Sequence, residues 1–71
     1  MNADLTKELL ARLAETRTHC QDMRFGQMLA TLGELAHDST GRSLWDIEDN
    51  ELAEVIERFR QDLAGREAGA A

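Results

Sequence analysis

Apolar residues recur at helical spacing in three separate stretches of the chain. In the first stretch they form one stripe: Leu5, Leu9, Leu13, Thr16 and Cys20. Intervals of three and four residues place these side chains on one side of a helix. The opposite edge carries Glu8 and Arg12, whose spacing suits an ion pair along a helix. The pattern predicts an amphipathic helix over residues 4–20.

The second stretch, residues 23–38, is apolar around more than half of a helical circumference. Its large apolar residues are Phe25, Met28, Leu29, Leu32, Leu35 and Ala36. Beside them runs a line of small residues with a histidine at its end: Gly26, Ala30, Gly33 and His37. A helix with so wide an apolar arc needs neighbours on two sides. We therefore expect this helix, capped by Asp22, to be the central element, packed between the other two.

After the second stretch the composition changes to turn residues over 39–43, with Gly41 among them. The apolar residues of 44–47 then cover too short a span for a helix, so we expect an extended segment there. A third helix is predicted over 49–64, capped by Asp49. Its apolar stripe consists of Leu52, Val55, Ile56, Phe59 and Leu63.

We expect Gly65 to end the third helix and residues 65–71 to form a disordered tail. The whole chain, residues 1–71, then forms one domain. Its predicted fold class is all-α, a three-helix domain with an extended segment between the second and third helices.

Charge and cysteine usage narrow the classes of partner. The net charge is −6, which disfavours binding to a nucleic-acid backbone. No apolar run is long enough to cross a bilayer, and no signal-peptide pattern is present. The single cysteine, Cys20, cannot form an intramolecular disulfide and suits a reducing compartment. We expect a cytoplasmic protein that binds neither nucleic acid nor membrane.

An acidic stretch is the most suggestive candidate for a metal site. Its acids have no basic residue among them: Asp46, Glu48, Asp49, Glu51, Glu54 and Glu57. Counted from Asp46, side chains with oxygen ligands fall at loop positions 1, 3, 5, 9 and 12 (Asp46, Glu48, Asn50, Glu54 and Glu57), the ligand spacing of an EF-hand calcium loop. However, Glu51 occupies the position where that loop needs a glycine, and the same residues carry the helical stripe. We interpret the acids as a solvated helix start and predict no metal and no other cofactor.

No nucleophile in the chain has a clear partner for catalysis. His19 and Cys20 are adjacent, and neighbouring side chains on a helix point about 100° apart. The thiol therefore lacks a base within hydrogen-bond reach, and we interpret Cys20 as a buried apolar group. His37 in the last turn suits the helix dipole, although it could also be a ligand or a pH-responsive contact. We predict that the protein is not an enzyme.

The small residues of the second helix predict a groove. Each glycine inside a helix costs about 1 kcal/mol relative to alanine, so Gly26 and Gly33 indicate that another backbone comes close. Two occupants stay open: the first helix of the same chain, or the same helix of a second subunit. Trp45, the single tryptophan, is interpreted as a lid over the helices, with an interface residue as the alternative.

Two short stretches, Arg-Phe-Gly-Gln-Met-Leu at 24–29 and Leu-Trp-Asp-Ile-Glu-Asp-Asn-Glu-Leu at 44–52, resemble a pattern in small bacterial helical proteins. That pattern is an Arg-Phe-Gly-Gln helix start followed by an Ile-Glu-Asp-x-Glu-Leu helix start. The resemblance covers the C-terminal two-thirds of the chain. It implies a small helical fold in which both stretches begin helices, and it implies no activity or cofactor.

These observations favour a non-enzymatic protein–protein interaction module that self-associates as a homodimer. The candidate partner-binding residues are Gly26, Ala30, Gly33, His37, Trp45, Asp46, Glu48 and Asp49. The alternative is a small acidic regulator or inhibitor. Its acids at 46–57 would block a basic surface of a nuclease, a toxin or a nucleic-acid-binding protein. A DNA-reading helix is disfavoured because the third helix is acidic where such a helix needs basic and amide groups.

Overall fold

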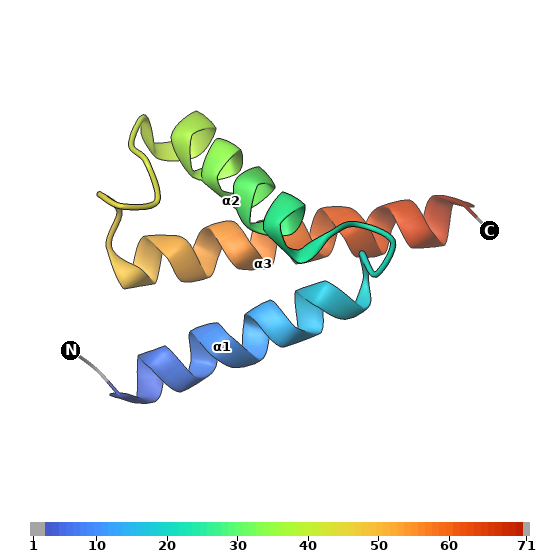
Figure 1. Cartoon of the computed structure of the whole chain (residues 1–71), viewed down its shortest axis with the longest axis horizontal. Coiled ribbons are helices and arrows are strands. Elements are labelled where there is room, and N and C mark those ends of the chain that lie inside the picture. Colours follow the sequence, from blue (N-terminus) through green and yellow to red (C-terminus); the bar gives the residue numbers. More distant parts are fainter. Residues whose placement is uncertain (1–2, 71) are drawn as a thin grey trace.

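The computed structural model describes residues 3–70, which form three helices joined by two connections (Figure 1). The helices are α1 (Ala3–Thr18), α2 (Phe25–Thr40) and α3 (Asp49–Ala70). Residues 3–70 contain no β-strand. The predicted all-α, three-helix architecture is therefore confirmed. In the same part of the chain, no helix combines the length and the apolar character needed to cross a bilayer.

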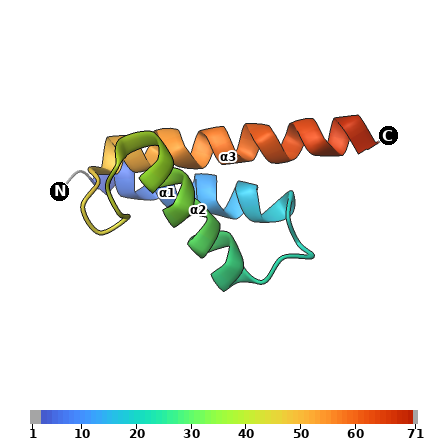
Figure 2. The same ribbon diagram turned by 90° about the horizontal axis from the view of Figure 1, so that it is seen from above.

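The central helix is α3, so the prediction that the second helix lies between the other two is wrong. Both α1 and α2 pack on α3, whereas α1 and α2 share no comparable interface within the described residues. Figures 1 and 2 show α1 and α3 side by side and running in the same direction, with α2 crossing them obliquely. Among the residues whose burial is described, the buried apolar residues of α3 are Val55, Ile56, Phe59 and Leu63, one more than α2 buries, and they form the part of the core that both neighbours cover.

The core lies where α1 and α2 meet α3. Its buried apolar residues are Cys20, Met28, Leu32, Ala36, Ile47, Val55, Ile56, Phe59 and Leu63. Partly buried side chains pack against them: Leu9, Leu13, Met23, Leu35 and Leu52. The stripes predicted for the first and third helices are thus the sides that face each other. Buried Thr16 satisfies its hydroxyl within α1, donating to the Arg12 carbonyl oxygen at 2.7 Å.

The second helix begins at Phe25 rather than at residue 23, and Arg24 rather than Asp22 occupies its cap position. The Arg24 backbone N–H donates to Gln27 Oε1 at 2.8 Å. This bond is the backbone half of a capping box, and it satisfies an N–H that the helix itself leaves unpaired. A glutamine three residues into the helix therefore decides where α2 begins.

The third helix begins in the same way. The Glu48 backbone N–H donates to Glu51 Oε1 at 3.0 Å, and Glu48 O accepts the Leu52 N–H at 2.9 Å. Glu48, not the predicted Asp49, therefore stands at the cap. Asp49 and Glu51 both lie in the first turn of α3, where a negative charge is favourable with the helix dipole.

The connection between α2 and α3 covers residues 41–48; the predicted turn at 39–43 is wrong at its start, because α2 continues through Ser39 and Thr40. Gly41 ends α2 with φ of 75°, a conformation that favours glycine, and its N–H donates to His37 O at 2.8 Å. Beyond it the backbone is more tightly turned than an extended segment. Both Asp46 N–H and Ile47 N–H donate to Ser43 O, at 3.0 and 3.2 Å. This turn allows Ile47 to enter the core.

The prediction of a disordered tail from Gly65 onward is wrong for the described residues, because α3 continues through Gly65 to Ala70. The last turns extend beyond the other two helices (Figure 1). Gly65 costs the helix only about 1 kcal/mol, and its neighbours Ala64 and Arg66 are among the best helix formers. A glycine without a following proline or turn residue therefore does not end the helix. Ala71 lies outside the described residues.

Candidate interaction surface

Trp45 is 94% exposed, so the prediction that it forms a lid over the helices is wrong. Its neighbours take the inward positions instead. Ile47 is buried, and the side chain of Leu44 lies against Gly33 of α2. Because the backbone turns at Ser43, the indole between these two anchors is left in solvent. The single tryptophan is thus the most exposed large apolar side chain among the residues whose burial is described.

Beside Trp45 lies a groove of about 600 Å³ along one side of α2. The helix contributes Leu29, Ala30, Gly33 and His37 to it, and the connection contributes Leu44 and Trp45. The groove therefore brings together four of the predicted partner-binding residues, from two separate parts of the chain. Leu29 and Leu44 are site residues that the sequence analysis did not single out.

The line of small residues is not filled by α1, so the prediction of a groove closed within one chain by the first helix is wrong. A Cβ added at Gly33 would meet only Leu44, at 3.6 Å from its Cδ1, which is an ordinary van der Waals contact. A Cβ added at Gly26 would have no neighbour within 4 Å. Ala30 is exposed. The groove is open to solvent along much of its length.

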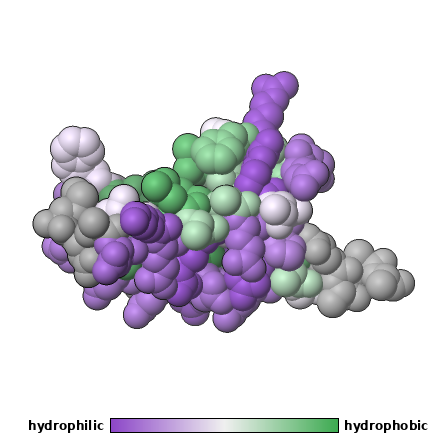
Figure 3. Space-filling view, turned by 90° about the horizontal axis from the view of Figure 1, so that it is seen from below, coloured by the Kyte–Doolittle hydropathy of each residue, from purple (hydrophilic) through white to green (hydrophobic). Residues whose placement is uncertain are grey.

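The wide apolar arc of α2 is therefore covered on one side only. Met28, Leu32 and Ala36 are buried, whereas Leu29 is 38% exposed and Phe25, one turn earlier, is 49% exposed. The space-filling view in Figure 3 shows hydrophobic side chains gathered in one area of a face that is otherwise largely hydrophilic. Scattered apolar residues on a surface are ordinary, but an apolar patch beside a groove is typical of an interaction site.

Arginines compensate two of the clustered acids: Arg60 lies in the next turn of α3, and Arg12 and Arg42 come from other parts of the fold. Arg12 Nη1 lies 3.2 Å from Glu57 Oε2, and Arg60 Nη2 lies 2.6 Å from Glu57 Oε1. The hydrogen bonds from Arg60 are the main reason why the pKa of the Glu57 carboxyl is lowered. Glu51 forms an ion pair with Arg42. The sequence shows no basic residue within this acidic stretch, but the fold brings three to its edges.

The remaining predicted partner-binding acids lie near Trp45. Asp46 accepts a hydrogen bond from Ser43 Oγ at 3.1 Å. Glu48, Asp49 and Asp46 are exposed. None of these three acids lines the groove, whose acidic residues are Glu34 and Asp38 of α2.

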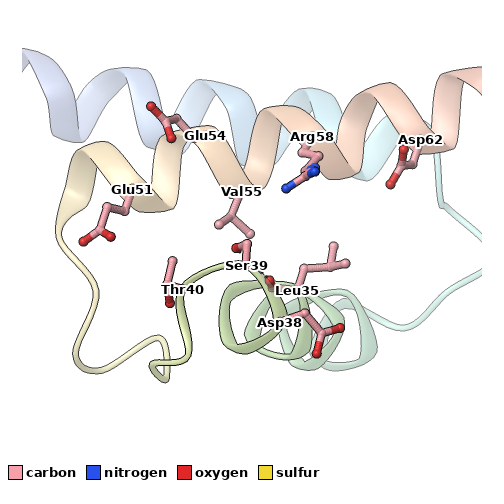
Figure 4. Close-up of a pocket in the computed structure, with 9 residues that line it drawn as sticks. All are labelled: Leu35, Asp38, Ser39, Thr40, Glu51, Glu54, Val55, Arg58 and Asp62. Carbon is pink, nitrogen blue, oxygen red and sulfur yellow. Dashed lines mark hydrogen bonds between the residues drawn. The ribbon is translucent and has the colours of Figure 1, made fainter.

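A second hollow, of about 560 Å³, lies between α2 and α3 (Figure 4). Its hydroxyl groups are used by the backbone of α2: Ser39 Oγ donates to Leu35 O at 2.9 Å, and Thr40 Oγ1 donates to Ala36 O at 2.7 Å. Figure 4 shows Asp38 and Arg58 on opposite sides of the space. Within residues 3–70, no group of three or more acidic, histidine or cysteine side chains could hold a metal ion.

Cys20 is buried with 3% of its surface exposed, as predicted. Its Sγ lies 3.5 Å from Thr16 O and donates a hydrogen bond to it. Burial raises the pKa of this thiol, although the positive charge of Arg17 opposes the shift. A buried thiol with a raised pKa is a poor nucleophile at neutral pH. Its environment is that of a core residue.

Comparisons with known proteins provide no relative from which the role of this surface could be inferred. No protein-family profile, no curated protein and no solved structure matches the chain. The groove of α2, with the exposed Trp45 beside it, is the feature of the described residues that an ordinary folded core does not account for.

Proposed function

We propose that this chain is a non-enzymatic protein–protein interaction module that self-associates as a homodimer through the groove of α2. The observation that carries the proposal is Trp45, 94% exposed beside a groove lined by Leu29, Ala30, Gly33 and Leu44, whose lining also includes Glu34, His37, Asp38 and Ser43. An aromatic side chain of this size buries about 150–250 Å² when it is covered. At about 25 cal/mol per Å² this is roughly 4–6 kcal/mol, a substantial contribution against the cost of association.

The shape of the groove favours a protein partner. It follows α2 from Leu29 to Asp38, a distance of about 14 Å along the helix axis. Grooves of this kind between a helix and a neighbouring segment accept apolar side chains of a second helix or loop. The net charge of −6 argues against a nucleic acid as the partner.

The proposal assigns structural rather than catalytic roles to the thiol of Cys20 and the hydroxyls of Ser39 and Thr40. Cys20 bonds to Thr16 O in the core, and the hydroxyls of Ser39 and Thr40 bond to carbonyl oxygens of α2. We place the module in the cytoplasm, a reducing compartment that suits a single unpaired thiol.

Sedimentation at a series of protein concentrations tests the proposal. We expect the average mass to rise from one chain toward two, because association depends on concentration. Trp45→Ala should shift the distribution toward the single chain. Leu10→Ala is the matched control, because Leu10 is 62% exposed on α1, away from the groove. A wild-type chain that keeps the mass of one copy at every concentration would refute self-association.

A further inference from the structure

We infer that the occupant of the groove is Trp45 of a second copy of this chain, inserted reciprocally so that each copy supplies one projecting indole and one groove. This inference rests on the proposed function and adds the identity of the buried group and the symmetry of the contact. It commits to a second copy rather than to an unrelated helix.

The first argument is that the projecting group and the hollow belong to one face. Trp45 both borders the groove and projects from it with 94% of its surface exposed. In a twofold dimer the same patch occurs on both sides, so a residue of one copy meets a different part of the patch on the other. A surface that carries both a knob and a hollow meets this requirement. A surface evolved for an unrelated helix would need only the hollow.

The second argument is the area available. Burying one Trp45 removes about 200 Å² from water, and the surface that receives it loses a similar area. Twofold symmetry doubles both contributions, giving about 800 Å² from the two indoles and the two grooves. A specific interface needs roughly 1,000 Å² in total. Phe25, 49% exposed and outside the groove lining, is the apolar surface next to it that can supply the remainder.

The third argument concerns the point where the two helices would cross. On α2 the groove runs from Leu29 to Asp38, and Gly33 lies near its middle. If two α2 helices run antiparallel about Gly33, Leu29 of one copy lies opposite His37 of the other. Gly33 and Ala30 lack bulk, so the two backbones can approach closely there. A close approach of two α2 helices would explain why small residues occupy these positions, whereas exposure to solvent would not.

The net charge of the chain allows binding of a second copy to be distinguished from binding of a basic partner by its salt dependence. Two copies each carry a net charge of −6 and repel one another, so added salt should strengthen their association by screening the repulsion. An acidic surface that binds a basic protein would show the opposite salt dependence.

A complementation titration tests the reciprocal insertion. Ala30→Gln places a longer polar side chain in the groove and keeps a good helix former at an exposed position. Its Trp45 is intact, but it has no open groove to offer. Trp45→Ala keeps the groove and removes the only tryptophan of the chain. Each variant alone forms no indole–groove pair, whereas a mixture can form one.

We expect each variant alone to self-associate at least about 30-fold more weakly than the wild type, the scale of an interface hot spot. Adding the tryptophan-free Trp45→Ala chain to the Ala30→Gln chain should move the indole emission to shorter wavelength. The double variant Trp45→Ala/Ala30→Gln is the control and should leave the emission unchanged. If the wild type self-associates but the mixture shows no shift, reciprocal insertion is wrong and the interaction module stands. If the wild type does not self-associate at all, the proposed function fails together with the inference.

Discussion

Arg12 of α1 and Glu57 of α3 form an ion pair across the interface that holds these two helices side by side, with 3.2 Å between Nη1 and Oε2. The residues are 45 positions apart in the chain. Arg12 also bonds Glu8 at 2.7 Å, and Arg60 connects Glu57 to Glu15 at 2.6 and 3.8 Å. The result is a chain of alternating charges along the α1–α3 contact. Such a network fixes the relative position of two parallel helices better than isolated surface pairs do.

The network predicts a pH-dependent contribution of Glu57 to stability. The pKa of its carboxyl is lower in the folded protein than its ordinary value of 4.5. A depressed pKa means that the stabilisation is present above that ordinary value and is lost as the pH falls through the folded value. Glu57→Gln should therefore lower the free energy of unfolding by urea at neutral pH, and this effect should shrink as the pH falls through the lowered pKa of Glu57 in the folded protein.

Glu54→Gln on the same helix is the control for the loss of a negative charge, because Glu54 is exposed. The two variants should differ at neutral pH and converge in acid. Equal effects of the two substitutions at neutral pH would show that the Arg12–Glu57 pair contributes no stability.

The central position of α3 predicts that truncating a buried residue of this helix lowers the free energy of unfolding strongly. Ile56 is fully buried at 0% exposure in the helix that packs against both others. Ile56→Ala should lower the free energy of unfolding by about 2–5 kcal/mol. Leu10→Ala, at 62% exposure, should change it by no more than about 0.5 kcal/mol. Chemical denaturation followed by circular dichroism measures both, and a small effect of Ile56→Ala would place the core elsewhere.

The continuation of α3 through Gly65 predicts opposite signs for two glycine substitutions. At Gly65 an added Cβ meets open space, so Gly65→Ala should raise the free energy of unfolding by up to about 1 kcal/mol. At Gly41, where φ is 75°, alanine is strained and should lower it by about 1 kcal/mol. Thermal melts of both variants decide the matter. If Gly65→Ala also destabilises the protein, Gly65 ends the helix as a left-handed cap.

Much of the fold could be predicted from the sequence, because helical periodicity reports which side of each helix is apolar. The stripe from Leu52 to Leu63 and the polar turn at Gly41 are local patterns, and the structure follows them. The position of α2 could not be predicted in this way. A wide apolar arc shows that a helix has much surface to bury, but not whether the neighbour belongs to the same chain. The arc of α2 was interpreted as evidence for a central helix, whereas one side of it is open.

The candidate surface was predicted in part. The small residues Ala30 and Gly33 were recognised as a groove because glycine is costly inside a helix. The direction of Trp45 depends on how the backbone turns after Ser43, and short polar residues permit several such turns. The partner of Glu57 comes from α1, far away in the sequence. Contacts of this kind follow from the tertiary arrangement and leave no local pattern.

The most direct test of the central claim is the fluorescence emission of the wild-type chain as a function of protein concentration. The chain contains one tryptophan, so the signal reports on Trp45 alone. Because Trp45 is 94% exposed in a single copy, dilute protein should emit as a solvated indole. At higher concentration we predict a saturable shift to shorter wavelength, in step with a rise in sedimentation mass toward two copies. A solvated spectrum at every concentration, or a rise in mass without a shift, would contradict the account.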